Sequence, residues 1–405
     1  MATDTTAPDT AQDQHGHMDP ARALVAPQDE VTVPVQTRSE RPRSFDPNEF
    51  GTPTGREVNW KHTPISRLAP LFAQSTDNDG VTYTFTSGAE FRAAGLAAGD
   101  SPRGEFFVPE DITAAVAWHG ATEALHIMLP REAEVADPIV VDIVGQGSDK
   151  RADGHLVIEA EPMSKGTVVL QHTGSAQYAQ NVEIIARDGS DLTVISVQKW
   201  DDDAIHASAH QARVDRDASL THFVITFGGG VVRVNPNLEL SGQGSEGRLF
   251  GLSYADAGQH FESQVYMFHK GAETTGDVLY KGALQGETAR SVWIGDVLIG
   301  EGGTATESYE ANRNLLLTSG ARADSIPNLE IKTGDIRGAG HASATGRFDD
   351  EQLFYLRSRG ISEVEARRVI VLGFLTEIPQ RIRIEELRET LVDDIEREIA
   401  EGVGT

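Results

Sequence analysis

The chain has 405 residues and a formal net charge of −27. This charge disfavours DNA or RNA as a partner, because nucleic-acid binding depends largely on Lys and Arg side chains that neutralise phosphates. The sequence contains no cysteine, which excludes disulfides, thiolate nucleophiles and Cys-ligated metal or cluster sites within this chain. Aromatic residues make up only 6% while glycines number 40, so we expect a core of small and β-branched side chains joined by many turns.

The N-terminal residues 1–55 are rich in Pro, Thr, Asp and Gln and carry only scattered apolar side chains. They cannot bury enough surface to offset their ordering entropy, so we predict a flexible acidic arm. The opening residues lack the basic and apolar regions of a secretion signal, and no run approaches the roughly 18 apolar residues of a membrane helix. We therefore expect a cytoplasmic protein without a membrane partner.

Residues 56–134 predict a mixed N-terminal subdomain. A helix is indicated from Trp60 to Phe72, and a short extended segment follows at 81–86. Apolar residues at helical spacing, with Asp111 available as N-cap, predict a further helix across 111–129.

Residues 135–346 show a different pattern, in which short apolar runs alternate with Gly, Asp, Asn and Ser. Examples are Val168–Leu170, Leu192–Val197 and Val292–Ile294. The runs recur mostly at intervals of about 11–15 residues, typical of a repeated strand and turn. A β-sandwich is an alternative, but turns such as ARDGSDLTV return the chain at similar intervals and favour the stacked coils of a β-helix. The ends of such a solenoid expose strand edges and need caps or partners.

Residues 347–405 change to a helical period. Ser362 and Glu365 stand at capping-box spacing, and Gly360 is well placed to end the preceding helix. A last helix from about 384 to 400 carries an apolar stripe that includes Leu387, Leu391 and Ile395.

Three motifs suggest chemistry but have simpler interpretations. The letters GQGSEG at 242–247 match a dinucleotide-binding motif, yet the strand-like RLFGLSYA follows where a helix is required, so we predict a loop. His206 and His210 have a metal-binding spacing only on a helix, and here they lie among strands. Asp201–Asp203 is interpreted as a solvated turn, although such acids could also serve a lyase or a calcium site. The sequence also lacks a Walker A loop, so any ATP hydrolysis must come from a partner.

His341 lies in the small-residue stretch GDIRGAGHASATG, between the last apolar run and the helices. A small-residue segment cannot bury a histidine deeply, and it permits the close approach of another backbone. From these residues alone, His341 is more typical of a hydrogen-bonding surface histidine than of a ligand.

The last third of the chain resembles the SufB/SufD family. The residues that carry the resemblance are, in order, YKGALQGETARSVWIGDVLI from Tyr280, YEANRNLLL from Tyr309, PNLEI from Pro327, HASATGRFDDEQLFYLRSRGI from His341 and EARRVIVLGFLTEI from Glu365. The similarity is strong over roughly 210–380 and weaker over most of 57–380, as judged by motif order and spacing.

This resemblance implies a mainly β fold, a right-handed parallel β-helix with flanking N-terminal mixed and C-terminal helical parts. It also implies a non-catalytic scaffold in a complex that assembles iron–sulfur clusters, where SufB-like and SufD-like subunits pair through their β-helix ends. The C-terminal helices would grip a SufC-like ABC ATPase, which makes Phe374, Leu387, Leu391 and Ile395 candidate docking residues. A homodimer through the same end is an alternative for the isolated chain.

Without a cysteine, the chain resembles the SufD type more than the SufB type, which looks to a cysteine as sulfur acceptor. His341 matches a histidine near the end of the solenoid in the family, and Ala339 stands where many members have a cysteine. His341 is therefore a candidate ligand for iron or a cluster at the SufB seam, since neutral imidazole binds iron. No cofactor is expected on this chain alone, and a flavin associated with the complex cannot be assigned to any residue.

Two other classes of function stay open at this point. A polysaccharide lyase or hydrolase also uses a parallel β-helix and would need a groove of carboxylates with Arg or Lys partners. An independent iron-binding protein would need its histidines to converge, which their spacing does not predict.

Overall fold

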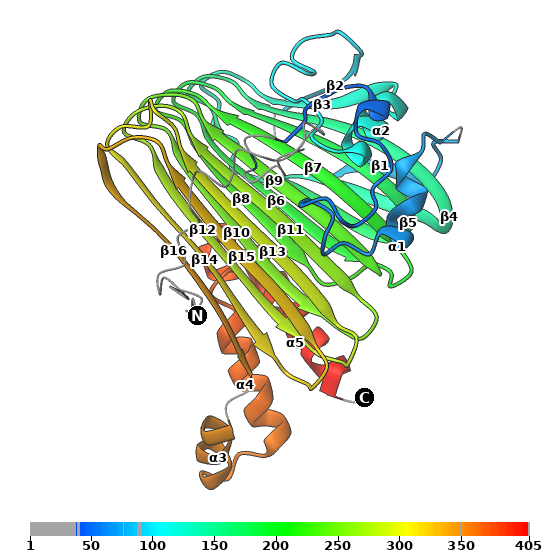
Figure 1. The fold of residues 1–405 in the computed structure, drawn as a ribbon, viewed down its shortest axis with the longest axis vertical. Coiled ribbons are helices and arrows are strands. Elements are labelled where there is room, and N and C mark those ends of the chain that lie inside the picture. The colour runs from blue at the N-terminus through cyan, green and yellow to red at the C-terminus, as the bar shows by residue number, and fades with distance from the viewer. Residues whose placement is uncertain (1–37, 39–40, 76, 87–90, 348–349, 404–405) are drawn as a thin grey trace, which may run out of the picture.

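The computed structural model describes residues 38, 41–75, 77–86, 91–347 and 350–403 (Figure 1). The body of the molecule is a solenoid of β-strands, with short helices near its N-terminal part and longer helices at the C-terminal end (Figure 1). Of the flexible arm predicted over residues 1–55, residues 1–37, 39 and 40 lie outside the described residues. No helix among the described residues is long and apolar enough to cross a membrane.

The strands follow one another along almost the whole described chain. Their bounds are β1 Val81–Thr86, β2 Arg92–Ala97, β3 Glu123–Leu129, β4 Ile139–Ala160, β5 Lys165–Ala186, β6 Asp191–Trp200, β7 Ile205–Val214, β8 Ser219–Thr226, β9 Val231–Leu240, β10 Glu246–Ala255, β11 His260–His269, β12 Thr275–Leu284, β13 Arg290–Ile299, β14 Thr306–Leu316, β15 Arg322–Ile331 and β16 Ile336–Arg347. The helices are α1 Ile65–Leu68, α2 Ile112–Gly120, α3 Asp350–Ser358, α4 Glu363–Leu375 and α5 Glu385–Val403, with short 3₁₀ turns η3 Pro47–Glu49, η4 Ala69–Phe72 and η5 Pro379–Arg381.

Each strand from β5 onward pairs in parallel with the strand two places along the chain. The odd-numbered strands β7 to β15 form one wall of the solenoid, the odd face, and the even-numbered strands β6 to β16 form the other, the even face. The long strands β4 and β5 run through both walls. A coil measures 27 residues from Ser219 to its partner Glu246 and 32 residues from Arg290 to its partner Arg322. The predicted repeat interval is thus about half a coil, and the parallel β-helix is confirmed over the sandwich.

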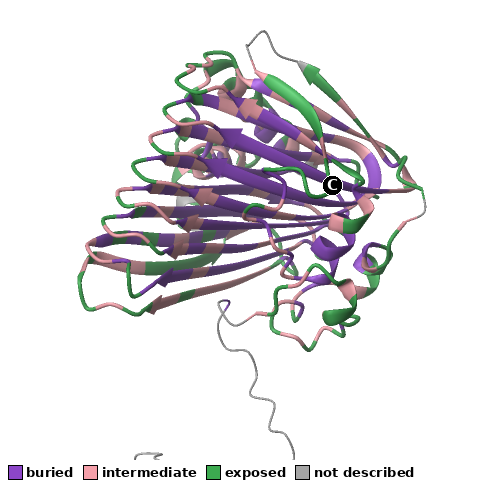
Figure 2. Ribbon diagram, turned by 90° about the horizontal axis from the view of Figure 1, so that it is seen from above, coloured by how far each residue is buried: buried purple, intermediate pink, exposed green. Residues whose placement is uncertain are grey.

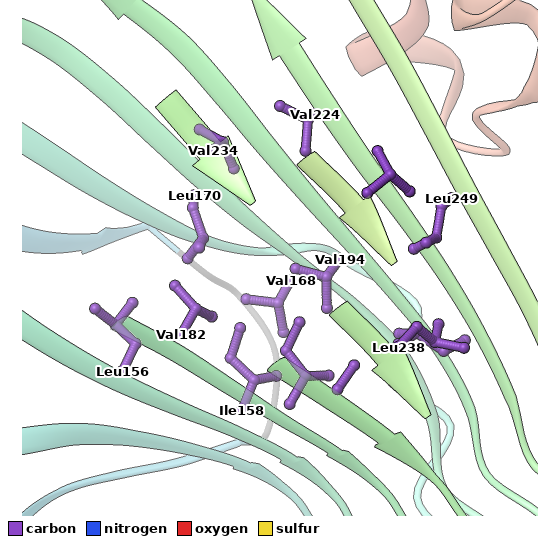
Figure 3. Close-up of a cluster of buried hydrophobic side chains, with 14 of the residues drawn as sticks. Leu156, Ile158, Val168, Leu170, Val182, Val194, Val224, Val234, Leu238 and Leu249 are labelled. Atoms are coloured by element: carbon purple, nitrogen blue, oxygen red, sulfur yellow. The ribbon is translucent and has the colours of Figure 1, made fainter. Parts of the chain in front are cut away.

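Aliphatic side chains fill the space between the two walls. Leu156, Val168, Leu170, Val194 and Leu249 project into this lumen and belong to one buried cluster (Figure 3). The turns between strands are exposed while the strand centres are buried (Figure 2). Lumen packing accounts for every second residue of the apolar runs, because side chains alternate between the faces of a strand.

The remaining residues of those runs point outward and are covered by the two ends of the chain. On the even face, Ile195, Phe223 and Leu252 pack against α4, α5 and the residues between them. On the odd face, Ala207 and Val231 pack against Trp60 and neighbours from α1 and α2. Strands buried on both sides read as nearly continuous apolar runs, which is what the sequence shows.

The N-terminal cover differs from the sequence prediction in three places. The helix predicted from Trp60 to Phe72 begins only at Ile65, as α1, and continues as the 3₁₀ turn η4. Residues 41–55 belong to the cover of the odd face, where Phe50 packs against the Trp60 cluster, so the predicted arm does not extend to residue 55. Arg38 anchors the start of this segment by donating from Nη1 to the carbonyl of Gln264 at 2.9 Å. The composition of this segment predicted that its ordering entropy would keep it flexible. Its polar contacts to the solenoid offset that entropy.

The helix predicted across 111–129 is correct only in its first half. Asp111 caps α2, its Oδ1 accepting from the amide of Ala114 at 3.0 Å, but α2 ends at Gly120. Leu125 and Met128 lie in β3, which pairs in parallel with β4. Pairing with the first coil of the solenoid outweighs the helical spacing of these residues.

The C-terminal helices follow the sequence prediction closely. Ser362 caps α4, its Oγ accepting from the amide of Glu365 at 3.2 Å. Gly360 follows α3 with a φ of +85°, a left-handed conformation that glycine adopts without strain. The last helix, α5, begins within a residue of the predicted start.

The open end of the solenoid as candidate functional site

The last coil leaves the solenoid with an open end. In the strand order of the sheet, β15 and β16 stand at the two termini, so each has a free edge. Most residues of β15 are half-buried and most of β16 are half-buried or exposed, whereas β13 one coil earlier is almost entirely buried. Free strand edges offer unpaired amides and carbonyls to another strand.

The stretch around His341 is a strand, within the range 135–346 predicted for the solenoid. β16 includes the whole of GAGHASATG up to Arg347 and pairs with β14, with a register shift beside Thr306. Gly and Ala have low strand propensity, so the sequence alone did not indicate a strand here. The long parallel pairing with β14 holds the segment in place.

His341 lies directly over Glu310, its partner across the β14–β16 ladder. The imidazole Nδ1 is 3.8 Å from Oε1 of Glu310, and the histidine side chain is 44% exposed. Beside it, Ser343 donates to Ser325 across the last coil at 2.8 Å. Ala339, two residues before the histidine, packs onto the lumen cluster.

Glu310 is a buried acid that sequence reasoning missed. Its side chain is 1% exposed, and neither Oε atom accepts a hydrogen bond from a side chain among the described residues. Burial raises the pKa of the Glu310 carboxyl to about 8, and the charge of Asp296 adds to the rise, while the amide of Asn328 partly offsets it.

Burial along β14 alternates with a period of two. On β14 the residues Ser308, Glu310, Asn312 and Asn314 are buried, and Glu307, Tyr309 and Arg313 are exposed. The inward side of β14 is therefore polar over this range. An acid at an inward position could have been recognised only after the strand register was known.

The histidines of the H-x-x-x-H pair lie deep in the lumen and do not converge on each other. His206 bonds through Nδ1 to the carbonyl oxygen of Tyr178 at 3.1 Å, while His210 bonds to His222 at 2.9 Å. Burial lowers the pKa of His206, His210 and His222 well below the usual value. Within the described ranges, no group of three or more His, Asp or Glu side chains is arranged to hold a metal ion.

The predicted docking stripe faces the solenoid. Leu391 and Ile395 are buried against the even face, and Phe374 and Leu387 pack at the margin of the same cluster. Lys281 of β12 also donates to the carbonyl of Phe374 at 2.9 Å. In this arrangement Leu391 and Ile395 are not available to a partner, because the apolar stripe of α5 packs against the solenoid of the same chain.

Exposed apolar residues of the C-terminal part lie elsewhere. Phe354 and Tyr355 of α3 are 74% and 56% exposed, and Val364 and Val369 of α4 are 57% and 45% exposed. An exposed apolar group of this kind is typical of a surface that contacts another protein. We call these four residues the α3–α4 patch.

A groove of about 850 Å³ runs between the even face and the start of α5. Its acid Asp191 accepts from Ser219 at 2.8 Å and from Arg383 at 3.2 Å. Although burial opposes it, these contacts lower the pKa of Asp191, which makes this carboxylate a poor general acid near neutral pH. The geometry does not favour the lyase alternative.

The other motifs occupy turns. Residues 241–245 connect β9 to β10, and Gly244 there has a φ of +73°, so the predicted loop is confirmed for the first four residues of the motif, while Glu246 and Gly247 begin β10. Asp201–Asp203 is an exposed turn between β6 and β7.

The fold and its end define a parallel β-solenoid protein with one open end and helices packed on both walls. Comparison with known proteins gives its family. Residues 143–374 match the family model described as "SUF system FeS cluster assembly, SufBD core domain". This match begins in the first coil and ends in α4, so it covers more than half of the chain.

Individual relatives agree. An iron-sulfur cluster assembly SufBD family protein of Mycobacterium bovis is 45% identical over 365 residues, which cover 88% of this chain and 91% of the relative. The iron-sulfur cluster assembly protein SufD of Escherichia coli is 25% identical over 392 residues, covering 87% of this chain and 90% of that protein. SufD of Bacillus subtilis is 27% identical over 281 residues, which cover 67% of this chain and 63% of that protein. The chain belongs to the SufBD family of iron–sulfur cluster assembly proteins.

Proposed function

We propose that this chain is the SufD-like scaffold subunit of an iron–sulfur cluster assembly complex. It pairs with a SufB-like subunit through the open end of the solenoid and binds a SufC-like ABC ATPase through its C-terminal helices. The observation that carries the proposal is the open end formed by β15 and β16, with free edges and a histidine over a buried acid. The chain acts as a cytoplasmic scaffold and not as an enzyme.

End-to-end pairing is supported by the state of the last coil. Ile331 at the end of β15 is 42% exposed, and both edge strands can continue into the strands of another solenoid. A second solenoid of the same width would bury the lumen residues that the last coil leaves half-exposed. A SufB-like subunit of the same family offers such an end.

ATPase binding is supported by the α3–α4 patch. The patch lies beyond the solenoid wall, at the part of α3 and α4 that projects from the body (Figure 1). Because α4 and α5 pack firmly on the even face, a force on the patch reaches the solenoid through buried side chains. Closure of two ATPase subunits would thus strain the seam between the two scaffolds and open the site that holds the nascent cluster.

His341 binds iron or the nascent cluster at this seam, with iron as cargo rather than as a resident cofactor. The donor set fits ferrous iron, since imidazole and carboxylate are common ligands of non-haem iron. The thiolates that a cluster requires come from the SufB-like subunit, because this chain has none. A flavin on the complex is part of the proposal without an assigned residue.

Co-purification tests the two interfaces separately. The full chain is co-expressed with SufB-like and SufC-like partners and compared with Ile331→Lys at the open end and Phe354→Asp in the patch. We expect Ile331→Lys to lower the affinity for the SufB-like partner, and Phe354→Asp to lower the affinity for the ATPase, each by about tenfold or more. Point variants are preferred to truncation after Arg347, because truncation also uncovers the even face.

Matched controls are exposed apolar residues far from either surface. Met163→Lys changes a 62% exposed side chain in the turn between β4 and β5, and Phe85→Asp changes a 39% exposed ring on β1. Both should retain both partners. Failure of the wild-type chain to retain either partner would overturn the scaffold proposal.

A further inference from the structure

We propose that Glu310 is a second iron-binding side chain, so that the His341 imidazole and the Glu310 carboxylate together hold ferrous iron at the open end of the solenoid. This inference rests on the proposed function, because it names the ligands with which the scaffold would receive iron. It adds a residue that lies outside the histidine stretch and that no motif in the sequence indicates.

The spacing of the two donors suits one metal ion. Nδ1 of His341 and Oε1 of Glu310 are 3.8 Å apart. Two ligands at about 2.0–2.2 Å from one ion, at tetrahedral or octahedral angles, stand roughly 3–3.5 Å from each other. A small rotation of the exposed imidazole closes this difference, since the side chain of His341 is 44% exposed while that of Glu310 is held at 1%.

Among the described residues, the ion-pair contact of the buried acid is with the imidazole of His341, 3.8 Å away. The atoms of Glu310 that would bind a cation, Oε1 and Oε2, accept no side-chain hydrogen bond among the described residues. The neighbouring acid Asp296 differs, because its Oδ1 accepts from Asn328 at 2.9 Å on the outer side of β13. Burying a carboxylate is costly, and a bound cation offsets its charge.

The opposite wall leaves room for this acid. Gly295 of β13 faces Glu310 across the lumen, and a Cβ atom at Gly295 would stand 2.5 Å from Oε2. Any larger residue there would displace the carboxylate. Above it, Ser343 and Ser325 are bonded to each other at 2.8 Å, and His341, the partner of Glu310 in the β14–β16 pairing, brings a basic side chain to the acid.

Two ligands from this chain leave coordination positions for water and for the partner's end. Ferrous iron accepts four to six ligands, and sites with few protein ligands keep open positions for exchange. Such a half-site suits a cargo that must be passed on. The SufB-like subunit would complete the coordination when the two solenoids meet.

The test measures metal binding directly instead of cluster yield. Full-length chain, alone and with its SufB-like partner, is dialysed anaerobically against Fe²⁺ with excess Mg²⁺ to occupy adventitious acidic sites. Co²⁺, whose visible absorption reports its ligands, provides a second readout. We expect Glu310→Gln to lower Fe²⁺ affinity about tenfold or more and to change the Co²⁺ spectrum, as His341→Ala does.

Glu307→Gln is the matched control, because it makes the same substitution three residues away on the exposed side of β14. It should leave both readouts unchanged, and thermal unfolding should show that Glu310→Gln folds as well as the parent. Loss of binding in His341→Ala but not in Glu310→Gln would overturn the inference and leave the scaffold proposal intact. A wild-type chain that takes up no Fe²⁺ in either state would also overturn it, while co-purification with the partners reports on the scaffold independently.

Discussion

The two walls of the solenoid are covered by opposite ends of the chain, and the two covers use different chemistry. On the odd face, Arg233 of β9 donates to Asp111 at 2.7 Å and to Glu262 at 3.1 Å. Its guanidinium also lies 4.2 Å from the ring centre of Trp60. On the even face, apolar residues such as Leu375, Ile395 and Ile399 fill the buried part of the cover, while ion pairs such as that of Lys199 with Asp394 add polar links to the wall.

This difference shows how each cover is positioned. A buried ion pair adds little net stability compared with apolar packing, but it tolerates only one geometry because misplacing either partner leaves a charge in the interior. Apolar packing contributes more free energy and permits small shifts. We infer that the charges of the N-terminal cover fix its position on the wall. The C-terminal helices are held mainly by the apolar surface that they bury, and they remain able to transmit movement.

The largest effect is expected from breaking the ionic cover. Arg233→Met removes the cation and leaves Asp111 and Glu262 buried without it, so the free energy of unfolding should fall by about 3–5 kcal/mol. Urea unfolding at neutral pH measures the loss. The control Arg248→Met removes a partly exposed pair with Glu246 and should change stability by less than about 1 kcal/mol. If Arg233→Met proved as stable as the parent, the charges would have no part in holding the odd-face cover.

A smaller and more local effect is expected on the even face. Ile395→Ala removes buried methyl and methylene groups from α5 and should cost about 3 kcal/mol. Because α5 is attached mainly by this apolar contact, with the Lys199–Asp394 ion pair beside it, we expect this helix to open before the solenoid does. Hydrogen exchange in α5 would detect the opening. Val369→Ala, at a 45% exposed position of α4, is the control and should change little. An equal loss of hydrogen-exchange protection in β6 to β12 would contradict the prediction that α5 opens independently of the solenoid wall.

The same contrast explains how much the sequence could predict. The solenoid and the helix caps at Asp111 and Ser362 follow from local signals, namely apolar runs separated by turns and a polar residue before a helical pattern. The outward half of each apolar run could not be assigned, because lumen and cover both require apolar residues. The N-terminal cover was missed for a related reason, since an isolated Arg38 or Phe50 is recognised as an anchor only when its partner on a distant coil is known.

The candidate site shows the same limit. His341 was found through a family resemblance, while Glu310 depended on the register between β14 and β16. The apolar stripe of α5 was a correct observation with an incorrect assignment. A stripe of this kind predicts burial but not the surface that buries it, and the described chain supplies that surface itself.

The smallest predicted effect concerns pH. Groups in the lumen and groups on the odd face should lose their contribution to the free energy of unfolding in different pH ranges. Burial lowers the pKa of His172 in the lumen to about 4. Its unfolded value is near 6.5, so its contribution to stability is complete above about pH 6.5 and is lost as the pH falls toward about 4. This one residue should cost about 2 kcal/mol at pH 5.

The odd face should respond only at lower pH. Burial alone would raise the pKa of Glu262, but the hydrogen bond with His260 and the charge of Arg233 outweigh it and lower the pKa to about 2. Its contribution is therefore present above about pH 4.5 and lost below it. Urea unfolding between pH 7.5 and 4 should show an early decline that His172→Gln makes shallower, whereas His119→Gln, at an exposed position, leaves the slope unchanged. A decline that began only below pH 4.5 would mean that the lumen histidines do not govern the first acid response, and that the ionic cover weakens first.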